Sequence, residues 1–442
     1  MKPVETTAGQ GRSVRDALHI LQRIFRDFPG GIRIRLWDGH TVSLGTHAPR
    51  FTVIFRDPGK FREMVLYRDP LRLAEAHFSG HVEIEGSIYD VLGLREHFQS
   101  LRLSAVEKAA ILARTLSIRQ IPASRQPDNP SRQRRNWRTK AFGSHSRQTD
   151  RHAIAFHYDV SNDFYRLWLD PEMVYSCAYF EKPEDDLDLA QRQKLDHICR
   201  KLRLQAGETL LDIGCGWGGL VCWAARHYGV RATGITLSRG QLDYAQEKIR
   251  REGLEDRVRV ELRDYRDLPG KELFDKVVSV GMFEHVGIRN LPLYFRTAHQ
   301  LLKPGGVFLN HGITSEDEGW RRNVNIEFIN RYVFPDGELE TMGNVLRGME
   351  QSGFEIVDVE ALRAHYALTL RHWVDRLESR REEAVRHTDE ATYRIWRMYM
   401  AGCALQFEAG EMGLYQILAA RREKGLARVP LTRRDLYPPP SP

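Results

Sequence analysis

The sequence predicts an α/β protein with a doubly wound, mostly parallel sheet and a smaller N-terminal α+β domain. Strand-like and helix-like segments alternate along residues 208–310, a glycine-rich turn joins the first of these strands to its helix, and residues 1–116 follow a different pattern. Such alternation is typical of a parallel sheet that binds its ligand at the carboxyl ends of the strands. At 442 residues the chain has room for two or three domains.

Residues 1–116 predict the small α+β domain. Residues 14–27 place their apolar side chains on one face of a helix. Two short strand-like runs then flank an Asp-Gly pair, which is typical of a hairpin turn. The predicted strands are 32–37, 41–44 and 51–55, and the predicted helices are 58–66, 70–78 and 90–115.

A basic segment, residues 117–150, separates this domain from the rest of the chain. Residues 117–151 contain nine Arg or Lys and two Asp, which gives +7, the same as the net charge of the whole protein. Three prolines and the lack of apolar periodicity predict a linker. It is either a solvated hinge or a strip that docks on a polyanion such as anionic lipid. No nucleic-acid recognition motif accompanies it, so we expect no nucleic-acid partner.

Residues 151–442 form the predicted catalytic domain. Its apolar runs are short enough for buried strands, and the segments between them have helical periodicity. The predicted strands are 208–213, 230–235, 258–263, 276–280 and 306–310, and the predicted helices are 220–227, 238–252 and about 290–302.

The turn Asp212-Ile-Gly-Cys-Gly-Trp-Gly-Gly219 predicts a ligand site. Glycines let the backbone approach a ligand, and the helix that follows presents free N–H groups. The glycine spacing also matches the dinucleotide fingerprint, but that fingerprint needs an acid after the next strand, where Gly234-Ile-Thr-Leu237 has none. Asp212 before the glycines and Asp264-Tyr265 after the third strand favour an S-adenosylmethionine site. A purely structural turn is the remaining alternative.

No segment predicts a membrane span, a secretory signal or a metal site. The longest run without a charged residue is 13 residues, 213–225, and a spanning helix needs about 20. The first residues contain no apolar region of the kind that signal peptides have. The chain has five cysteines, an odd number, and no two of them have the spacing of zinc ligands. We therefore expect a cytoplasmic protein with free thiols.

Eight motifs follow one another between residue 150 and about residue 420. They are His157-Tyr-Asp-Val-Ser-Asn-Asp163, Tyr175-Ser-Cys-Ala-Tyr-Phe180, Leu211-Asp-Ile-Gly-Cys-Gly-Trp-Gly-Gly219, Gly234-Ile-Thr-Leu-Ser238, Gly281-Met-Phe-Glu-His-Val-Gly287, Leu302-Lys-Pro-Gly-Gly306, His311-Gly-Ile313 and Phe328-Ile-Asn-Arg-Tyr-Val-Phe-Pro-Asp-Gly337. In this order they resemble the cyclopropane fatty acid synthase family, which includes the mycolic acid cyclopropane synthases.

The resemblance implies transfer of a methylene group from S-adenosylmethionine to the cis double bond of an unsaturated phospholipid acyl chain. It also implies a bicarbonate ion in the active site and a homodimer. Because the double bond lies inside a bilayer while no segment predicts a spanning helix, we expect peripheral association with the inner face of the membrane, through the basic segment on anionic lipid. An alkene is a poor nucleophile, so holding it in line with the donor can supply about 7–11 kcal/mol. The carbocation that forms must be kept from water and must lose a proton to a nearby base.

Two groups of residues are implied by the same motifs. The residues expected to bind the cofactor are Tyr175, Ser176, Asp212, Gly214, Gly216, Thr236, Leu237, Gln241, Asp264 and Tyr265. The residues expected to cage the bicarbonate are Cys177, Glu284, His311, Ile313 and Tyr366. In this cage Glu284 and His311 would hold the ion and accept or relay its proton, Tyr366 would donate a hydrogen bond, and the other two would act mainly through backbone groups.

Each of these residues also has an ordinary explanation. Taken alone, His311 is explained as a structural histidine, Glu284 as an acid at a helix start, and Cys177 as a small core residue. The motifs are also compatible with a methylene- or methyl-branched product on the same fold. A small-molecule methyltransferase and a lipid- or cofactor-binding protein without turnover are the alternatives of other classes.

Overall fold

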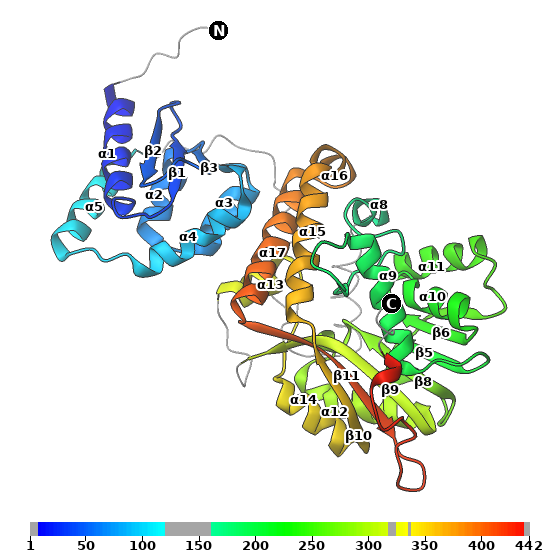
Figure 1. The fold of residues 1–442 in the computed structure, drawn as a ribbon. Helices are drawn as coiled ribbons and strands as arrows, with labels where there is room; N and C mark the ends of the chain where they lie inside the picture. The colour runs from blue at the N-terminus through cyan, green and yellow to red at the C-terminus, as the bar shows by residue number, and fades with distance from the viewer. Residues whose placement is uncertain (1–7, 120–160, 317–323, 335–336, 437–442) are drawn as a thin grey trace. The chain divides into compact units, whose positions relative to one another are not determined.

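The computed structural model describes residues 8–119, 161–316, 324–334 and 337–436, and these form two compact units (Figure 1). The first unit contains residues 8–119 together with Asp389–Gly402, and the second contains the other described residues. Nearly all of the predicted basic segment lies outside the described residues.

The first unit is built on a four-stranded sheet in the order β2-β1-β3-β4. β1 and β2 form the antiparallel hairpin that the Asp-Gly pair predicts, β3 is parallel to β1, and β4 is antiparallel to β3. Phe51 and Phe55 of β3 and Phe61 of α2 are buried in its core. The elements are α1 (Ala8–Ile24), β1 (Gly31–Arg35), β2 (Thr41–Gly45), β3 (Phe51–Phe55), α2 (Pro58–Tyr67), α3 (Pro70–Phe78), β4 (Val82–Gly86), α4 (Ile88–Ser100) and α5 (Ala105–Ser117).

The prediction of one helix over residues 90–115 is wrong, because two helices occupy this stretch. α4 ends at Ser100, and α5 begins after Ser104. The Ser104 side chain accepts from the backbone N–H of Glu107, whose carboxylate accepts from the Ser104 N–H. This pair of hydrogen bonds is a capping box, which satisfies two backbone N–H groups at the first turn of a helix. It marks Ser104 as the start of a new helix.

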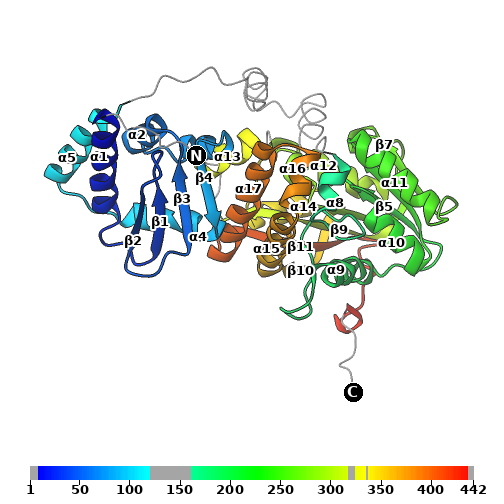
Figure 2. The same ribbon diagram turned by 90° about the horizontal axis from the view of Figure 1, so that it is seen from above.

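The second unit contains a seven-stranded sheet in the order β10-β11-β9-β8-β5-β6-β7, with β7 and β10 at its two edges (Figure 2). β5 to β9 pair in parallel, whereas β11 runs antiparallel to both β9 and β10. This confirms the predicted doubly wound, mostly parallel sheet. The strands are β5 (Thr209–Ile213), β6 (Arg231–Thr236), β7 (Val258–Leu262), β8 (Phe274–Val280), β9 (Leu302–Ser315), β10 (Phe354–Ala361) and β11 (Met412–Arg421).

Helices cover both faces of this sheet, because its central strands are apolar on both sides. Leu210 belongs to a core cluster shared with α9, α10 and α11, and its neighbour Leu211 belongs to one shared with α12 and α14. Successive residues of a strand face opposite sides, so the run Leu210-Leu211 needs helices on each. The helices of the second unit are α8 (Asn162–Arg166), α9 (Leu187–Leu202), α10 (Gly219–Tyr228), α11 (Arg239–Arg251), α12 (Leu291–Leu301), α13 (Val324–Tyr332), α14 (Met342–Gln351), α15 (Arg363–Ser379) and α16 (Arg381–His387). The last helix, α17 (Glu390–Ala409), belongs to the first unit up to Gly402 and to the second unit beyond it.

Within the described part of the chain, no helix combines the length and the apolar character that a bilayer span requires.

Candidate active site

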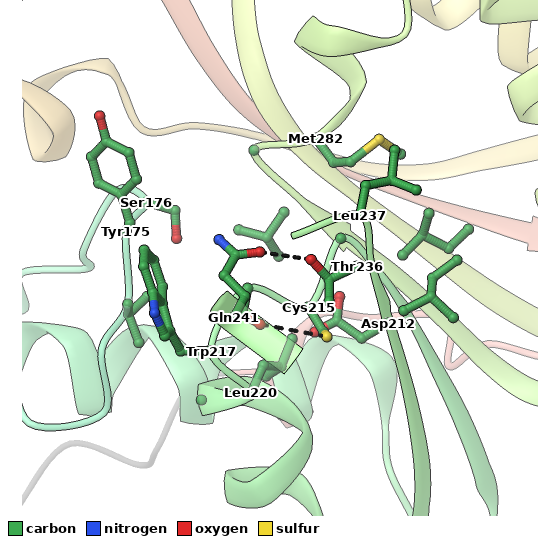
Figure 3. A pocket seen from close by; sticks show the side chains of 18 of the residues that line it. Tyr175, Ser176, Asp212, Cys215, Trp217, Leu220, Thr236, Leu237, Gln241 and Met282 are labelled. Carbon is green, nitrogen blue, oxygen red and sulfur yellow. Dashed lines mark hydrogen bonds between the residues drawn. The ribbon is translucent and has the colours of Figure 1, made fainter. Parts of the chain in front are cut away.

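A cavity lies at the carboxyl ends of β5, β6, β7 and β8 (Figure 3). Its walls come from the turns that follow these strands and from the segment that precedes α9. All ten residues that the sequence assigns to cofactor binding line it, namely Tyr175, Ser176, Asp212, Gly214, Gly216, Thr236, Leu237, Gln241, Asp264 and Tyr265. The structure therefore brings these residues together around one space.

Gly216 shows why the turn after β5 is rich in glycine. Its φ is +54°, in the left-handed region that other residues rarely adopt. A Cβ built on Gly216 meets no heavy atom within 4 Å. Since Gly216 lines the cavity, a side chain there would occupy space in which a ligand can lie.

The ends of β6 and β7 present ordered polar groups to the cavity. The Thr236 hydroxyl donates to Gln241 Oε1 at 2.7 Å, as Figure 3 shows, and accepts from the Ser238 backbone N–H at 3.2 Å. The Asp264 carboxylate accepts from the Arg266 guanidinium at 2.6 and 2.9 Å. Asp264 is therefore held in place by Arg266 and meets a ligand with part of its charge already balanced.

A buried lysine that the sequence analysis missed also lines the cavity. Lys194 of α9 donates to the Ser176 hydroxyl at 3.1 Å. Burial lowers the pKa of Lys194 to about 8, although the negative charge of Asp170 opposes this. Burial raises the pKa of Asp212 to about 7, although the charge of Lys194 opposes it. One signal was available, because Lys194 interrupts the apolar face that Leu195 and Ile198 share on α9.

The segment Tyr175–Phe180, which lies outside regular secondary structure, is held by α9 and α15. Gln191 of α9 donates to the Ser176 carbonyl at 2.9 Å, and Thr369 of α15 accepts from the Ala178 N–H at 3.0 Å. Both side chains are buried. The two helices therefore fix the backbone on either side of Cys177.

The five residues predicted to cage an ion, all of which the structure describes, lie outside the lining of this cavity. Two of them are joined directly, because the Ile313 N–H of β9 donates to Glu284 Oε1 at 2.8 Å. Gly312 makes this approach possible, since a Cβ there would lie 2.0 Å from the Phe283 ring. The Ile313 N–H is thus already engaged, and it holds Glu284 in position.

Contacts through Leu362 connect the other members of the predicted cage. The Leu362 carbonyl accepts from the Tyr366 N–H at 3.1 Å and lies 3.8 Å from Cys177 Sγ. The Leu362 N–H donates to the carbonyl of Leu414 at 2.8 Å, and Leu414 pairs with Ile313 across the sheet. Together with the hydrogen bond between Ile313 and Glu284, these contacts connect four of the five predicted cage residues, namely Cys177, Glu284, Ile313 and Tyr366.

Glu284 and His311 each have one buried polar atom that the described part of the chain leaves without a partner. Among the described residues, no group hydrogen-bonds to Glu284 Oε2 or to His311 Nε2. Burial raises the pKa of Glu284 to about 7, against the effect of the Ile313 N–H. Burial, together with the charges of Lys194 and Lys201, holds the pKa of His311 well below its usual range. Unpartnered buried groups are costly, so these two atoms point to a polar ligand.

Cys177 is not suited to nucleophilic chemistry. Its thiol is fully buried and donates to the Ala178 carbonyl at 3.2 Å. Burial raises the pKa of this thiol far above its usual value, despite the charge of Lys194. Because the thiolate is the reactive form, Cys177 is inert in this setting.

Comparison with known proteins identifies relatives of both units. The profile of the family described as mycolic acid cyclopropane synthetase matches residues 145–417, and that of a domain of unknown function matches residues 19–100. A probable fatty acid methyltransferase of Pseudomonas putida is 43% identical over 410 residues, 92% of this chain and 96% of that protein. The cyclopropane-fatty-acyl-phospholipid synthase of Escherichia coli (strain K12) is 42% identical over 272 residues, 61% of this chain and 68% of that protein.

Solved structures show the same likeness. The mycolic acid cyclopropane synthase CmaA1 complexed with SAH and CTAB is 34% identical, with a TM-score of 0.58. The superposition covers 61% of this chain and 98% of CmaA1. The shared part is thus the size of the second unit, and its relative was solved with the demethylated cofactor bound.

Gly216→Val should weaken binding of S-adenosylhomocysteine at least tenfold in isothermal titration calorimetry, because the new side chain enters the cavity. The left-handed conformation adds a stability cost of about 1–2 kcal/mol. Gly253→Val is the matched control, since Gly253 has a φ of +64°, meets nothing within 4 Å and lies outside the cavity lining. Equal binding by the two variants would show that the glycine turn does not contact the cofactor.

Cys177→Ser should keep a sizeable fraction of S-adenosylmethionine-dependent turnover, because the serine hydroxyl can replace the thiol as a small buried donor to the Ala178 carbonyl. Turnover and S-adenosylhomocysteine affinity are measured side by side. Complete loss of turnover in a folded variant that still binds S-adenosylhomocysteine would assign Cys177 a covalent role.

Proposed function

Because the chain belongs to the mycolic acid cyclopropane synthetase family and is an S-adenosylmethionine-dependent methyltransferase, we propose that it forms cyclopropane rings on unsaturated phospholipid acyl chains. The methylene carbon comes from S-adenosylmethionine and bridges a cis double bond. The observation that carries this proposal is a buried carboxyl and a buried imidazole next to the cavity, each with an atom that the described residues leave unpartnered. Gly281, which lines the cavity, donates through its N–H to the His311 carbonyl at 2.8 Å. Ser176 lines the cavity, and the next residue, Cys177, belongs to the connected region around Glu284.

The groups around the cavity fit S-adenosylmethionine. Asp212 Oδ1 is buried and has no hydrogen-bond partner among the residues that the structure describes, so it can accept from the ammonium of the methionyl part. Gly216 leaves room for close backbone approach, and the hydrogen-bonded pair of Thr236 and Gln241 offers polar groups to a ribose. When bound, the cofactor supplies a methyl group on a positively charged sulfur.

The buried pair Glu284 and His311 fits bicarbonate. That ion has one O–H group and several acceptor oxygens, so it needs one acceptor and at least one donor. Glu284 Oε2 can accept, and a neutral imidazole with its hydrogen on Nε2 can donate. When bound, bicarbonate supplies a base that does not add to a carbocation. With a pKa near 7, Glu284 can take up a proton at neutral pH.

A series of aromatic rings, all buried except the half-buried Tyr175, protects the reaction from water. The Tyr175 ring, at the cavity, lies 5.2 Å from the Trp373 ring, which lies 6.0 Å from the ring of Tyr366. Trp168 and Phe407 extend the series at 5.3 Å from Tyr175 and 4.8 Å from Tyr366. As the alkene attacks the methyl carbon, positive charge moves onto the acyl chain. Aromatic faces stabilise such a cation without capturing it, by about 2 kcal/mol when desolvated.

A second outcome on the same site is favoured by one comparison. The Pseudomonas putida relative, to which 92% of this chain aligns, is described as a probable fatty acid methyltransferase. Both outcomes begin with transfer of the methyl group to one alkene carbon. The ring closes if the new methyl group loses a proton and the electron pair of that C–H bond joins the cationic carbon. If a hydride shift first moves the cation to the methylated carbon, the same proton loss gives a methylene branch. Loss of a proton from the acyl chain instead gives a methyl-branched alkene.

The test is incubation with S-adenosylmethionine and vesicles of defined unsaturated phospholipids, followed by proton NMR of the extracted lipid. We expect high-field cyclopropyl signals, one ring for each S-adenosylhomocysteine released. Mass alone does not distinguish ring from methylene product because they are isomers. Branch signals without cyclopropyl signals would support the second outcome, and no turnover on any vesicle would contradict both.

The first unit offers a surface that fits a membrane. Val106, Leu112 and Leu116 of α5 are 79%, 50% and 54% exposed, and they project from one side of the helix, away from the buried Ile111. Contiguous exposed apolar residues mark interaction sites. Lys108 of the same helix is exposed, and the basic segment follows α5 in the chain. We assign the first unit and the basic segment to docking on anionic phospholipid, and this docking gives the catalytic unit access to acyl chains. The resemblance to the family also leads us to expect a homodimer.

Replacing Arg132, Arg134, Arg135 and Arg138 with Gln should weaken binding to anionic vesicles and raise the apparent KM for them. Each arginine contributes at most about 1 kcal/mol, and salt weakens the attraction. Affinity for S-adenosylhomocysteine should not change. Vesicle co-sedimentation at low and high salt measures the effect, and equal binding of variant and parent at low salt would make this segment a solvated hinge.

The double variant Leu112→Gln/Leu116→Gln separates the apolar contribution to the same docking. It should bind vesicles more weakly at every salt concentration, since the hydrophobic contribution is not screened. If binding is unchanged but the oligomeric state shifts, α5 contacts a second copy of the chain instead of lipid.

Glu284→Gln should lower turnover more than tenfold while affinity for S-adenosylhomocysteine stays within a few-fold. The amide keeps an oxygen for the Ile313 N–H but cannot take up a proton. At constant bicarbonate the turnover of the parent should fall as pH drops below about 7, where Glu284 becomes protonated. The variant should lack this limb of the pH profile; near-parental turnover in the variant would contradict the assignment.

A further inference from the structure

Three polar side chains form a row on one face of the second unit's sheet. Gln416 of β11 pairs in register with Glu360 of β10 and with His311 of β9. Side chains of residues paired in this way lie on the same face. Leu309 and Leu418, two residues from His311 and Gln416, belong to the core cluster shared with α9. The row therefore faces α9, and Gln416 lies fully buried in its centre.

Gln416 makes one hydrogen bond that bears on the chemistry of His311. Its amide nitrogen lies 3.1 Å from His311 Nδ1. An amide nitrogen can only donate, so Nδ1 must accept, and a neutral ring then carries its hydrogen on Nε2. That Nε2 is the buried atom for which the described residues provide no partner.

The surroundings keep the His311 ring from gaining a second proton. The ring is buried, and the nearby positive charges of Lys194 and Lys201 disfavour an imidazolium more than Glu360 favours it. His311 is therefore neutral, and the position of its single hydrogen decides whether Nε2 donates or accepts. Glu284 Oε2, by contrast, is an atom that can accept.

We propose that Gln416 is a positioning residue that holds His311 in the tautomer with hydrogen on Nε2, so that His311 donates to the anion and Glu284 alone accepts the proton. This inference rests on the proposed function and divides the roles of the two residues within it. The proton that leaves the new methyl group ends on Glu284 Oε2. His311 keeps one ring hydrogen throughout turnover, so the balance needs no further base.

Gln416→Glu tests the proposal with little change in shape. A carboxylate facing Nδ1 accepts, so it draws the ring hydrogen to Nδ1 and leaves a lone pair on Nε2. That lone pair would face the anion and repel it. Gln416→Leu removes the hydrogen bond to His311 Nδ1 but does not reverse its direction. It replaces Gln416→Glu in the test if that charged variant does not fold. Gln351→Glu, at the exposed end of α14, is the matched control for the added charge.

The first measurement is a long-range ¹H–¹⁵N NMR spectrum of protein labelled on histidine, with the His311 signals assigned by their loss in His311→Gln. In the parent and in Gln351→Glu we expect the pattern of a neutral ring with hydrogen on Nε2. In Gln416→Glu the pattern should change to hydrogen on Nδ1. Hydrogen on Nδ1 in the parent, or the same pattern in all variants, would overturn the proposal.

The second measurement is turnover as a function of bicarbonate in degassed buffer. Gln416→Glu should raise the half-saturating bicarbonate concentration at least tenfold and leave S-adenosylhomocysteine affinity within twofold of the parent. If the parent responds to bicarbonate and Gln416→Glu matches it, the role of Gln416 is refuted. If the parent shows no response although bound ion has been removed, bicarbonate itself is refuted, and the NMR result alone then decides the tautomer.

Discussion

The hydrogen bond from the Ile313 N–H to Glu284 Oε1, 2.8 Å long, is the contact on which the rest of the site depends. It joins the turn after β8 to strand β9. It requires glycine at position 312, because a Cβ on Gly312 would collide with the Phe283 ring. By occupying one carboxyl oxygen it leaves Glu284 Oε2 as the atom that must find another partner. Burial of this half-satisfied carboxyl raises its pKa to about 7, which suits a group that exchanges protons at neutral pH.

One short segment joins the cavity to the region around Glu284. Ser176 lines the cofactor cavity and Cys177 contacts the Leu362 carbonyl, so neighbouring residues join the two regions. Gln191 and Thr369 hold the backbone before and after Cys177. Two helices therefore fix the backbone between the cavity and the region around Glu284.

The sequence predicted what local patterns encode. The strands from β5 to β8 and the glycine turn followed from apolar runs and glycine spacing, which act over a few residues. β4 was missed because Val82–Gly86 is only five residues long and contains two apolar side chains, too few to establish an alternating pattern. Gln416 was missed for another reason: its partner His311 is 105 residues away. Only the antiparallel pairing of β11 with β9 brings them together, and no periodicity reports such a pairing.

We propose that Glu284 and His311 hold a single anion beside the cofactor. Titration of the protein with ¹³C-labelled bicarbonate in the presence of S-adenosylhomocysteine, followed by ¹³C NMR, tests this directly. One saturable bound signal per chain, lost in His311→Ala but retained in Gly253→Val, is the predicted result. Absence of any saturable bicarbonate signal from protein that binds S-adenosylhomocysteine and has been stripped of retained ion would contradict the claim.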